Sequence, residues 1–166
     1  LIGSALGPYP YPLIVREFQS LIGREVAAQL KIIGIDRPDL LIACVGGGSN
    51  ALGLFYPFLC DPAIQCFGIE AGGKGIESGA NAIRFGGQGS PGIVQGYQSY
   101  FIQDDFGQVL PTHSICAGLD YAGVSPELAS LHDQKRVHFK SIDDHEALEA
   151  YRMLSCSEGI IPALES

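Results

Sequence analysis

Basic residues are scarce in this sequence. The 166 residues include 10 lysines and arginines against 18 aspartates and glutamates, which gives a formal net charge of −8. Contacts with nucleic acids and with anionic membrane surfaces depend on lysine and arginine, so this balance argues against both as partners. No apolar run is long enough to span a bilayer. The first twelve residues also lack the basic start of a secretory signal peptide, and we expect a cytoplasmic protein.

Disulfide and metal-ligand motifs are missing as well. The five cysteines are odd in number and no two form a C-x-x-C motif, and the four histidines show no metal-ligand spacing. This pattern predicts free thiols in a reducing compartment. Methionine occurs only at Met153, and the chain stops soon after Pro162, where a new helix is expected to begin. We therefore expect one partial domain over residues 1–166, truncated at both ends.

Strands and helices are predicted to alternate along the chain. The unbroken apolar run LLIACV at residues 40–45 is typical of a strand buried on both faces of a parallel sheet. This alternation indicates an α/β fold with three layers, αβα, around a mostly parallel sheet. Two further strands are predicted at residues 64–69 and 137–142, and helices at residues 13–33, 51–60 and 125–135 and from Asp143 to Gly159.

Local signals support some of these boundaries. Ser125 followed by Pro126 predicts a capped helix start. Asp143 with Glu146 three residues later has the pattern of a capping box. Residues 72–107 are rich in glycine, serine and glutamine and have little periodicity, which predicts a long irregular loop.

The most informative motif is the glycine turn that follows the first predicted strand. Gly46, Gly47 and Gly48 allow close approach of a ligand to the backbone, and Ser49 and Asn50 open the next helix. No lysine or arginine is nearby in the sequence, so an anion would be held by backbone N–H groups. The absence of the Walker lysine makes a P-loop nucleotidase a poor interpretation. The turn therefore favours one phosphomonoester.

The residues of this glycine turn allow two other interpretations. Gly46 to Ala51 satisfies G-x-G-x-x-A, and Glu70 ends the next predicted strand about twenty residues later, at the distance of an acidic ribose ligand in dinucleotide-binding proteins. That pattern would suit an NAD-dependent oxidoreductase. A glycine turn that only lets a helix pack against a strand is the third possibility. The spacing of the glycines leaves all three open.

Five blocks of the sequence resemble one enzyme family in order. The blocks are GPYPYPLIVREFQ (residues 7–19), ACVGGGSNALG (43–53), GIEAGGKGIESG (68–79), SICAGLDYAGVSP (114–126) and SEGIIPALES (157–166). Together they resemble the tryptophan synthase β chains. The resemblance implies part of a fold-type-II pyridoxal-phosphate enzyme, the larger C-terminal-side domain of the β chain. It also implies condensation of serine with indole, an α-chain partner and a β-chain homodimer.

The resemblance assigns cofactor-binding residues one by one. It implies that a loop matching Gly46, Gly47, Gly48, Ser49 and Asn50 binds the phosphate of pyridoxal phosphate. Gly3 and Ser4 match a small-residue pair near the same pocket. Gly118 matches a glycine whose backbone lies beside the cofactor.

Two carboxylates and a cation site are implied in the same way. Asp120 matches an aspartate that helps to close the site, and Glu165 matches a glutamate near the cofactor ring. Taken alone, these residues would be a turn former and a helix first-turn acid. Backbone carbonyls at Gly46, Leu119 and Tyr121 match part of a site for a monovalent cation, sodium or potassium.

One element of the family is not matched by any residue here. The lysine that attaches the cofactor lies, in the family, before the region that this sequence covers, and Lys31, Lys74, Lys135 and Lys140 match no such role. We therefore expect the 166 residues to be inactive by themselves. A phosphate-binding or partner-docking module without catalysis is the non-enzyme alternative. Val94 and Gln95 stand where the family often has an aromatic pair along its indole passage, and Gly123 stands where a serine is common.

Overall fold

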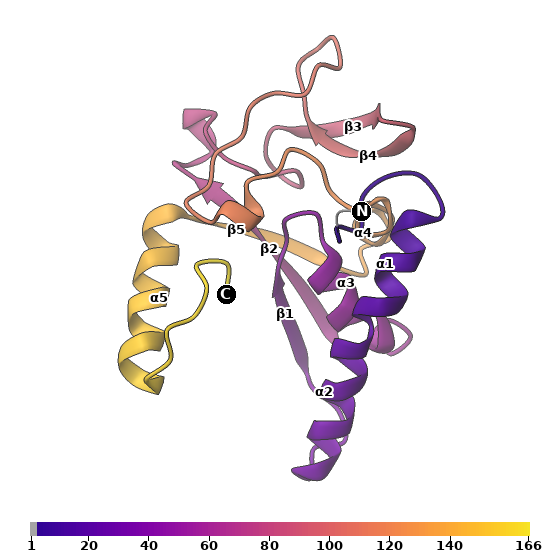
Figure 1. The fold of residues 1–166 in the computed structure, drawn as a ribbon, viewed down its shortest axis with the longest axis vertical. Coiled ribbons are helices and arrows are strands. Elements are labelled where there is room, and N and C mark those ends of the chain that lie inside the picture. Colours follow the sequence, from indigo (N-terminus) through magenta and orange to yellow (C-terminus); the bar gives the residue numbers. More distant parts are fainter. Residues whose placement is uncertain (1–2) are drawn as a thin grey trace.

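Three parallel strands form the central sheet. The computed structural model describes residues 3–166. Strands β1 (Leu40–Cys44), β2 (Gln65–Gly73) and β5 (His138–Asp143) are arranged in the order β1-β2-β5 (Figure 1). Leu40 pairs with Gln65 and Phe67 with His138, both in parallel register. The predicted α/β class with a mostly parallel sheet is confirmed, and so is the pairing of its first two strands.

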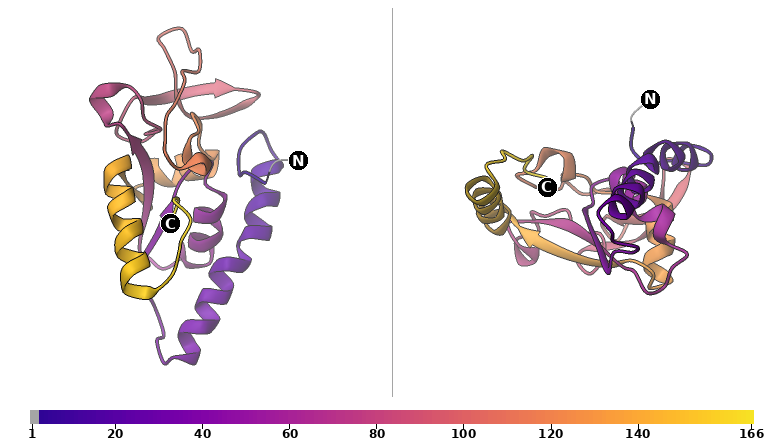
Figure 2. Two further views of the ribbon diagram at one scale, coloured as in Figure 1. Left: turned by 60° about the vertical axis from the view of Figure 1, so that its left-hand side comes forward. Right: turned by 90° about the horizontal axis from the view of Figure 1, so that it is seen from below.

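Helices lie on both sides of this sheet. On one side, α3 (Ser49–Phe55) packs on β1, and α1 (Tyr11–Gln19) and α2 (Leu21–Ile32) pack on α3. The short helix α4 (Pro126–Asp133) adds Leu128 and Ala129 to the same core. The last helix, α5 (Asp144–Glu158), lies on the other side, away from α1 and α2 (Figure 2). This arrangement gives the expected three layers.

The first predicted helix is in fact two helices. It was expected to run unbroken over residues 13–33, but α1 ends at Gln19 and α2 begins at Leu21. Ser20 separates them, and its hydroxyl donates a hydrogen bond of 2.8 Å to the carbonyl of Glu17. Serine hydroxyls that bond to the preceding turn often bend a helix. The amide of Ser20 still donates to the carbonyl of Arg16, so the interruption is local, and apolar periodicity does not reveal it.

The predicted irregular loop contains an antiparallel hairpin. Strands β3 (Gly89–Val94) and β4 (Tyr97–Ile102) pair through Val94 and Tyr97, and the hairpin lies beyond the end of the central sheet (Figure 1). Gln95 and Gly96 connect them with φ values of 50° and 81°. Two positive φ values match the two-residue turn that suits hairpin twist. The expectation of a loop at residues 72–107 was therefore wrong for this part.

Helix ends follow the local signals closely. The Ser125 side chain accepts a hydrogen bond from the amide of Glu127 at the start of α4. Asp143 and Glu146 form the full capping box at the start of α5, and Gly159 ends that helix with φ 67°. These three predictions are confirmed. No helix in residues 3–166 combines the length and apolar character needed to cross a membrane.

Candidate functional site

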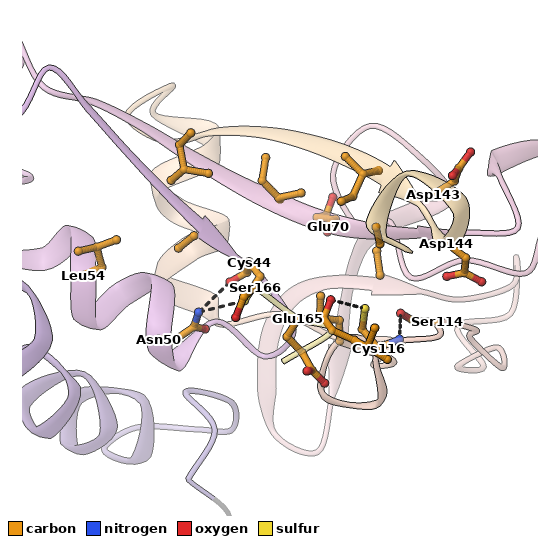
Figure 3. Close-up of a pocket in the computed structure, with 18 of the residues that line it drawn as sticks. Cys44, Asn50, Leu54, Glu70, Ser114, Cys116, Asp143, Asp144, Glu165 and Ser166 are labelled. Atoms are coloured by element: carbon orange, nitrogen blue, oxygen red, sulfur yellow. Dashed lines mark hydrogen bonds between the residues drawn. The ribbon is translucent and has the colours of Figure 1, made fainter. Parts of the chain in front are cut away.

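The glycine turn lies at the carboxyl end of β1. Its conformation is held from two sides. The side-chain amide of Asn50 donates to the carbonyl of Cys44 at 3.1 Å and to its thiol at 3.3 Å (Figure 3). The amide of Ser125 donates to the carbonyl of Gly47 at 3.0 Å, which ties the turn to the N-cap of α4. The turn is thus fixed before any ligand arrives.

At each glycine of the turn, an added Cβ would come within 2.4 Å of a neighbouring atom. A Cβ on Gly46 would lie 2.4 Å from the carbonyl oxygen of Gly118, and one on Gly47 would lie 1.9 Å from the hydroxyl of Ser4. Gly48 has φ 100°, in the left-handed region, and its Cβ would lie 2.3 Å from Leu128. The turn therefore brings three separate segments into close contact with its backbone.

A hollow of about 430 Å³ opens over this turn. Residues that are far apart in the sequence form its wall, from the N-terminal segment, the turn, the loop around Gly118 and the C-terminal segment. These are Gly3, Ser4, Cys44, Gly46, Gly47, Gly48, Ser49, Asn50, Gly118, Leu119 and Glu165. The wall thus includes every residue that the sequence assigns to cofactor binding, together with one of the two carboxylates.

Backbone N–H groups of the turn remain available to a ligand. Within the part of the chain that the structure describes, the amides of Gly47, Gly48, Ser49 and Asn50 donate no hydrogen bond, whereas Leu52 already donates to Gly48. Four such donors beside a hollow can together bind the oxygens of one phosphate group. Asn50 contributes through its backbone only, because its side chain is used on Cys44.

The two carboxylates lie in different places. Glu165 lines the hollow, and its Oε1 accepts a hydrogen bond of 2.9 Å from the amide of Gly118. Asp120 is exposed and lines a neighbouring hollow of about 490 Å³, which shares Ser4, Gly47 and Gly118 with the first. The rest of the second wall is mainly apolar, and includes Leu6, Ile14, Val15, Ala117 and Gln95 of the hairpin turn.

A third hollow, of about 480 Å³, lies beside the open face of the sheet, between β1 and α5 (Figure 3). The C-terminal segment runs along it, so that Glu165 and Ser166 lie near Cys44 and Asn50. The thiol of Cys116 donates to the carbonyl of Leu164 at 2.9 Å and holds this segment in place. Burial raises the pKa of the Cys44 thiol, so Cys44 stays protonated and is a wall residue rather than a nucleophile.

Glu70 is not available to a ribose. It lies inside β2, which continues to Gly73, and does not end the strand as predicted. Its side chain is 0% exposed. Its carboxylate accepts hydrogen bonds from the amides of Arg84 and Phe85, at 2.9 and 3.0 Å. The acidic residue that the dinucleotide interpretation requires is therefore buried and already used, which removes the support for an NAD site.

The partner of Glu70 is the equally buried Arg84. Arg84 Nε lies 3.0 Å from Glu70 Oε1, close enough for an ion pair but without hydrogen-bond geometry. Burial raises the pKa of Glu70 and lowers that of Arg84, because it disfavours both charges, while each partner opposes the shift of the other. The search for charged residues near the glycine turn in the sequence missed Arg84, because Arg84 lies 38 positions from Gly46.

Arg84 also contacts the predicted cation ligands. Its guanidinium donates to the carbonyl oxygens of Gly46 and Tyr121, both at 2.9 Å. The carbonyl of Leu119 accepts from the amide of Tyr121 at 2.9 Å. All three predicted ligands thus have a donor within the chain, and two of them face a positive charge. The residues present do not fit a sodium or potassium ion at this point.

The four lysines lie elsewhere. Lys31 is in α2, Lys74 follows β2, Lys135 follows α4, and Lys140 is in β5. None of them lines any of the three hollows. Among residues 3–166 there is also no group of three or more histidine, cysteine, aspartate or glutamate side chains that could hold a metal ion.

Comparison with known proteins gives one sequence relationship and one fold relationship. The chain is 54% identical over 165 residues to tryptophan synthase beta chain 1 of Chlamydia caviae, which is 99% of this chain and 40% of that protein. The tryptophan synthase beta chain of Chlamydia trachomatis is also 54% identical, over 99% of this chain and 42% of its own length. No family model matches.

Solved structures share the fold at low sequence identity. A threonine deaminase from T.th. superposes with a TM-score of 0.62 and 19% identity, over 96% of this chain and 44% of that one. Maize serine racemase superposes with a TM-score of 0.53 and 16% identity, over 89% of this chain and 38% of the other. These likenesses show that the chain shares its α/β fold with parts of both proteins.

Proposed function

We propose, from the premise that this sequence belongs to the tryptophan synthase beta chain family, that the chain supplies the phosphate-binding part of a pyridoxal-phosphate-dependent lyase. The chain spans about 40% of the length of the relatives that it matches. The activity is therefore proposed for the whole protein: β-replacement that joins L-serine and indole to give L-tryptophan and water. We assign residues 1–166 to one partial domain of that enzyme.

The main support for this proposal is the hollow over the glycine turn. It brings four unused backbone N–H groups, the small residues Gly3 and Ser4, and the carboxylate of Glu165 to one place. The amides can hold one phosphate group by hydrogen bonds. A second phosphate would be repelled by the negative charge of Glu165, which lines the same hollow. The hollow therefore suits a monophosphate better than a dinucleotide.

The residues of this chain would orient the cofactor and enclose the substrates. When bound, pyridoxal phosphate supplies the electron sink that stabilises negative charge on the α carbon of an amino acid. Gly47, Gly48 and Ser49 would hold its phosphate. Asp120, at the edge of the neighbouring hollow, would help to close the site over the amino acid. The apolar wall of that hollow, including Ile14, offers a place for an uncharged aromatic substrate such as indole.

The partners follow from the same proposal. For the whole protein we propose an α chain, a second β chain in a homodimer, and a cytoplasmic location. Apolar side chains on the outer surface of α1 and α2 support a covered surface in the assembled protein. Phe18 is 78% exposed and Leu21 53% exposed on adjacent helix ends, and apolar patches of this kind commonly mark interfaces.

We call the glycine turn at residues 46–50, with its free backbone N–H groups, the cradle. Calorimetric titration tests this cradle as a monophosphate site against the dinucleotide interpretation. Pyridoxal phosphate and inorganic phosphate should bind at a single site and compete with each other. NAD should not bind measurably, because Glu70 is buried against Arg84 and cannot accept a ribose hydroxyl. Binding of NAD with an affinity equal to or above that of pyridoxal phosphate would refute the cradle as a monophosphate site.

Lysine chemistry tests whether the catalytic amine lies within this chain. No lysine lines the hollows, so the 166-residue chain mixed with pyridoxal phosphate, serine and indole should form no tryptophan above background. Borohydride reduction followed by peptide mass spectrometry should find no single lysine that carries the cofactor. Sustained turnover, or unique labelling of one of the four lysines, would show that the catalytic amine lies within this chain.

A further inference from the structure

Arg84 is a fully buried cation whose hydrogen-bonding capacity is directed at partners within the chain. An arginine carries five N–H donors. Nη1 donates to the carbonyls of Ala82, at 2.7 Å, and Tyr121, at 2.9 Å. Nη2 donates to the carbonyls of Val45 and Gly46. The fifth donor, Nε, faces the carboxylate of Glu70. The side chains of Arg84 and Glu70 are both 0% exposed.

These partners come from segments that are distant in the sequence. Val45 and Gly46 join the end of β1 to the glycine turn, and Tyr121 follows the loop that carries Gly118. Ala82 lies between β2 and the hairpin, and Glu70 lies within β2. One positive charge therefore joins the floor of the cradle to the loop on its far side. Moving that charge would allow the turn and the Gly118 loop to separate.

The arrangement has the chemistry of a coordinated cation. Several backbone carbonyls and one carboxylate surround a single positive charge in a site closed to water, and rings of carbonyls serve alkali ions in the same way. The sequence resemblance assigns Gly46 and Tyr121 to a monovalent-cation site, and their carbonyls are bonded to Arg84 instead. A second cation in contact with the guanidinium would be repelled by it.

We propose that Arg84 is a built-in cation that takes the place of a dissociable sodium or potassium ion beside the glycine turn. The guanidinium is permanently charged and more weakly hydrated than an ammonium group, which suits it to a buried site. The geometry of the cradle is then independent of the salt in solution. The inference rests on the proposed function only for its effect on cofactor binding, and thermal unfolding tests it without any cofactor.

The first arm of the test is thermal unfolding of the unmodified protein in different salts. Melting curves are recorded in sodium, potassium, caesium and choline chloride at equal ionic strength, which keeps general screening constant. The four midpoints should agree within about 1 °C, because no cation binds the native state specifically. A midpoint that rises saturably with one alkali ion overturns the proposal.

The second arm creates the missing site. Arg84→Ala leaves the carbonyls of Gly46 and Tyr121 and the carboxylate of Glu70 without their cation. This variant should melt lower in choline chloride and recover saturably with potassium, sodium or guanidinium, with a preference set by ion size. If it is unfolded in choline chloride, potassium should restore the fold. An alanine variant that responds to none of these cations overturns the proposal.

Two variants separate this role from ordinary packing. Arg84→Lys keeps a positive charge and should be insensitive to the choice of alkali ion. Arg136 donates to the carbonyls of Phe58, Leu59 and Asp61, and no carboxylate within residues 3–166 pairs with it. Arg136→Ala should therefore lose stability without gaining any response to potassium. Failure of cofactor binding would count against the cradle and leave these curves unchanged, so the two proposals can fail separately.

Discussion

Replacing Glu70 by glutamine is expected to lower the free energy of unfolding by about 3–5 kcal/mol, because it leaves the buried charge of Arg84 without its partner. Glutamine also brings an N–H₂ group to a place where the amides of Arg84 and Phe85 both need acceptors. One of these donors would lose its partner in a site closed to water. Urea unfolding followed by circular dichroism measures the loss directly.

Glu77 provides the matched control for this substitution. It is an exposed glutamate in the short 3₁₀ helix that follows β2. Glu77→Gln makes the same chemical change where water can solvate both side chains, so its effect should stay within about 0.5 kcal/mol. Equal losses for the two variants would contradict the account of Glu70 and Arg84 as a buried ion pair that holds the cradle together.

Replacing Gly47 by alanine is expected to weaken the binding of phosphate and pyridoxal phosphate at least tenfold, which is about 1.4 kcal/mol. The new Cβ would lie 1.9 Å from the hydroxyl of Ser4 and 3.3 Å from Leu6. The serine hydroxyl can rotate away, so the fold should survive. The methyl group and the displaced hydroxyl would then occupy the space in front of the amides that hold the anion. Calorimetry with each ligand measures the change.

Gly3→Ala tests whether any added methyl group has this effect. Gly3 lines the same hollow, and a Cβ there would meet no atom within 4 Å. Its affinity for phosphate should remain within about twofold of the unmodified chain, a change of less than about half a kcal/mol. If both alanine variants weaken binding equally, the anion does not depend on the close contact between Gly47 and Ser4.

The sequence predicted the parts of the fold that depend on local signals. The unbroken apolar run at residues 40–45 identified β1, because such a run is typical of a strand in a parallel sheet. Its predicted burial on both faces was wrong, since Leu40 is 45% exposed and Ile42 is 56% exposed, and Ile42 lines the hollow between β1 and α5. The caps at Ser125 and Asp143 were predicted because cap residues act on neighbours two or three positions away. The glycine turn could be recognised for the same reason, since its residues are contiguous.

Features that depend on distant contacts were missed. The hairpin of β3 and β4 turns through Gln95 and Gly96, which lack the usual asparagine–glycine signal, and glycines interrupt its strand pattern. Arg84 looked like an ordinary residue of an irregular loop, and its role emerges only when β1, β2 and the loop at Tyr121 come together. No local sequence pattern predicts that these three segments come into contact.

The grouping of the wall residues was a mixed case. Gly3, Gly118 and Glu165 carry no motif of their own, and only the resemblance to a family assigned them to the glycine turn. In the structure they line one hollow, and the hydrogen bond between Glu165 and Gly118 links two segments that are 47 positions apart. The cation ligands were assigned by the same resemblance. There the chain departs from the expected pattern, because a side chain supplies the positive charge.

Amide NMR titration tests the central claim most directly. The chain is labelled with ¹⁵N and titrated with inorganic phosphate and then with pyridoxal phosphate. We predict that the amides of Gly47, Gly48, Ser49 and Asn50 shift together and saturate with one affinity for each ligand, because these N–H groups are free and lie beside the hollow. Saturable shifts confined to other residues, with the four turn amides unmoved, would contradict the assignment of this turn as the phosphate cradle.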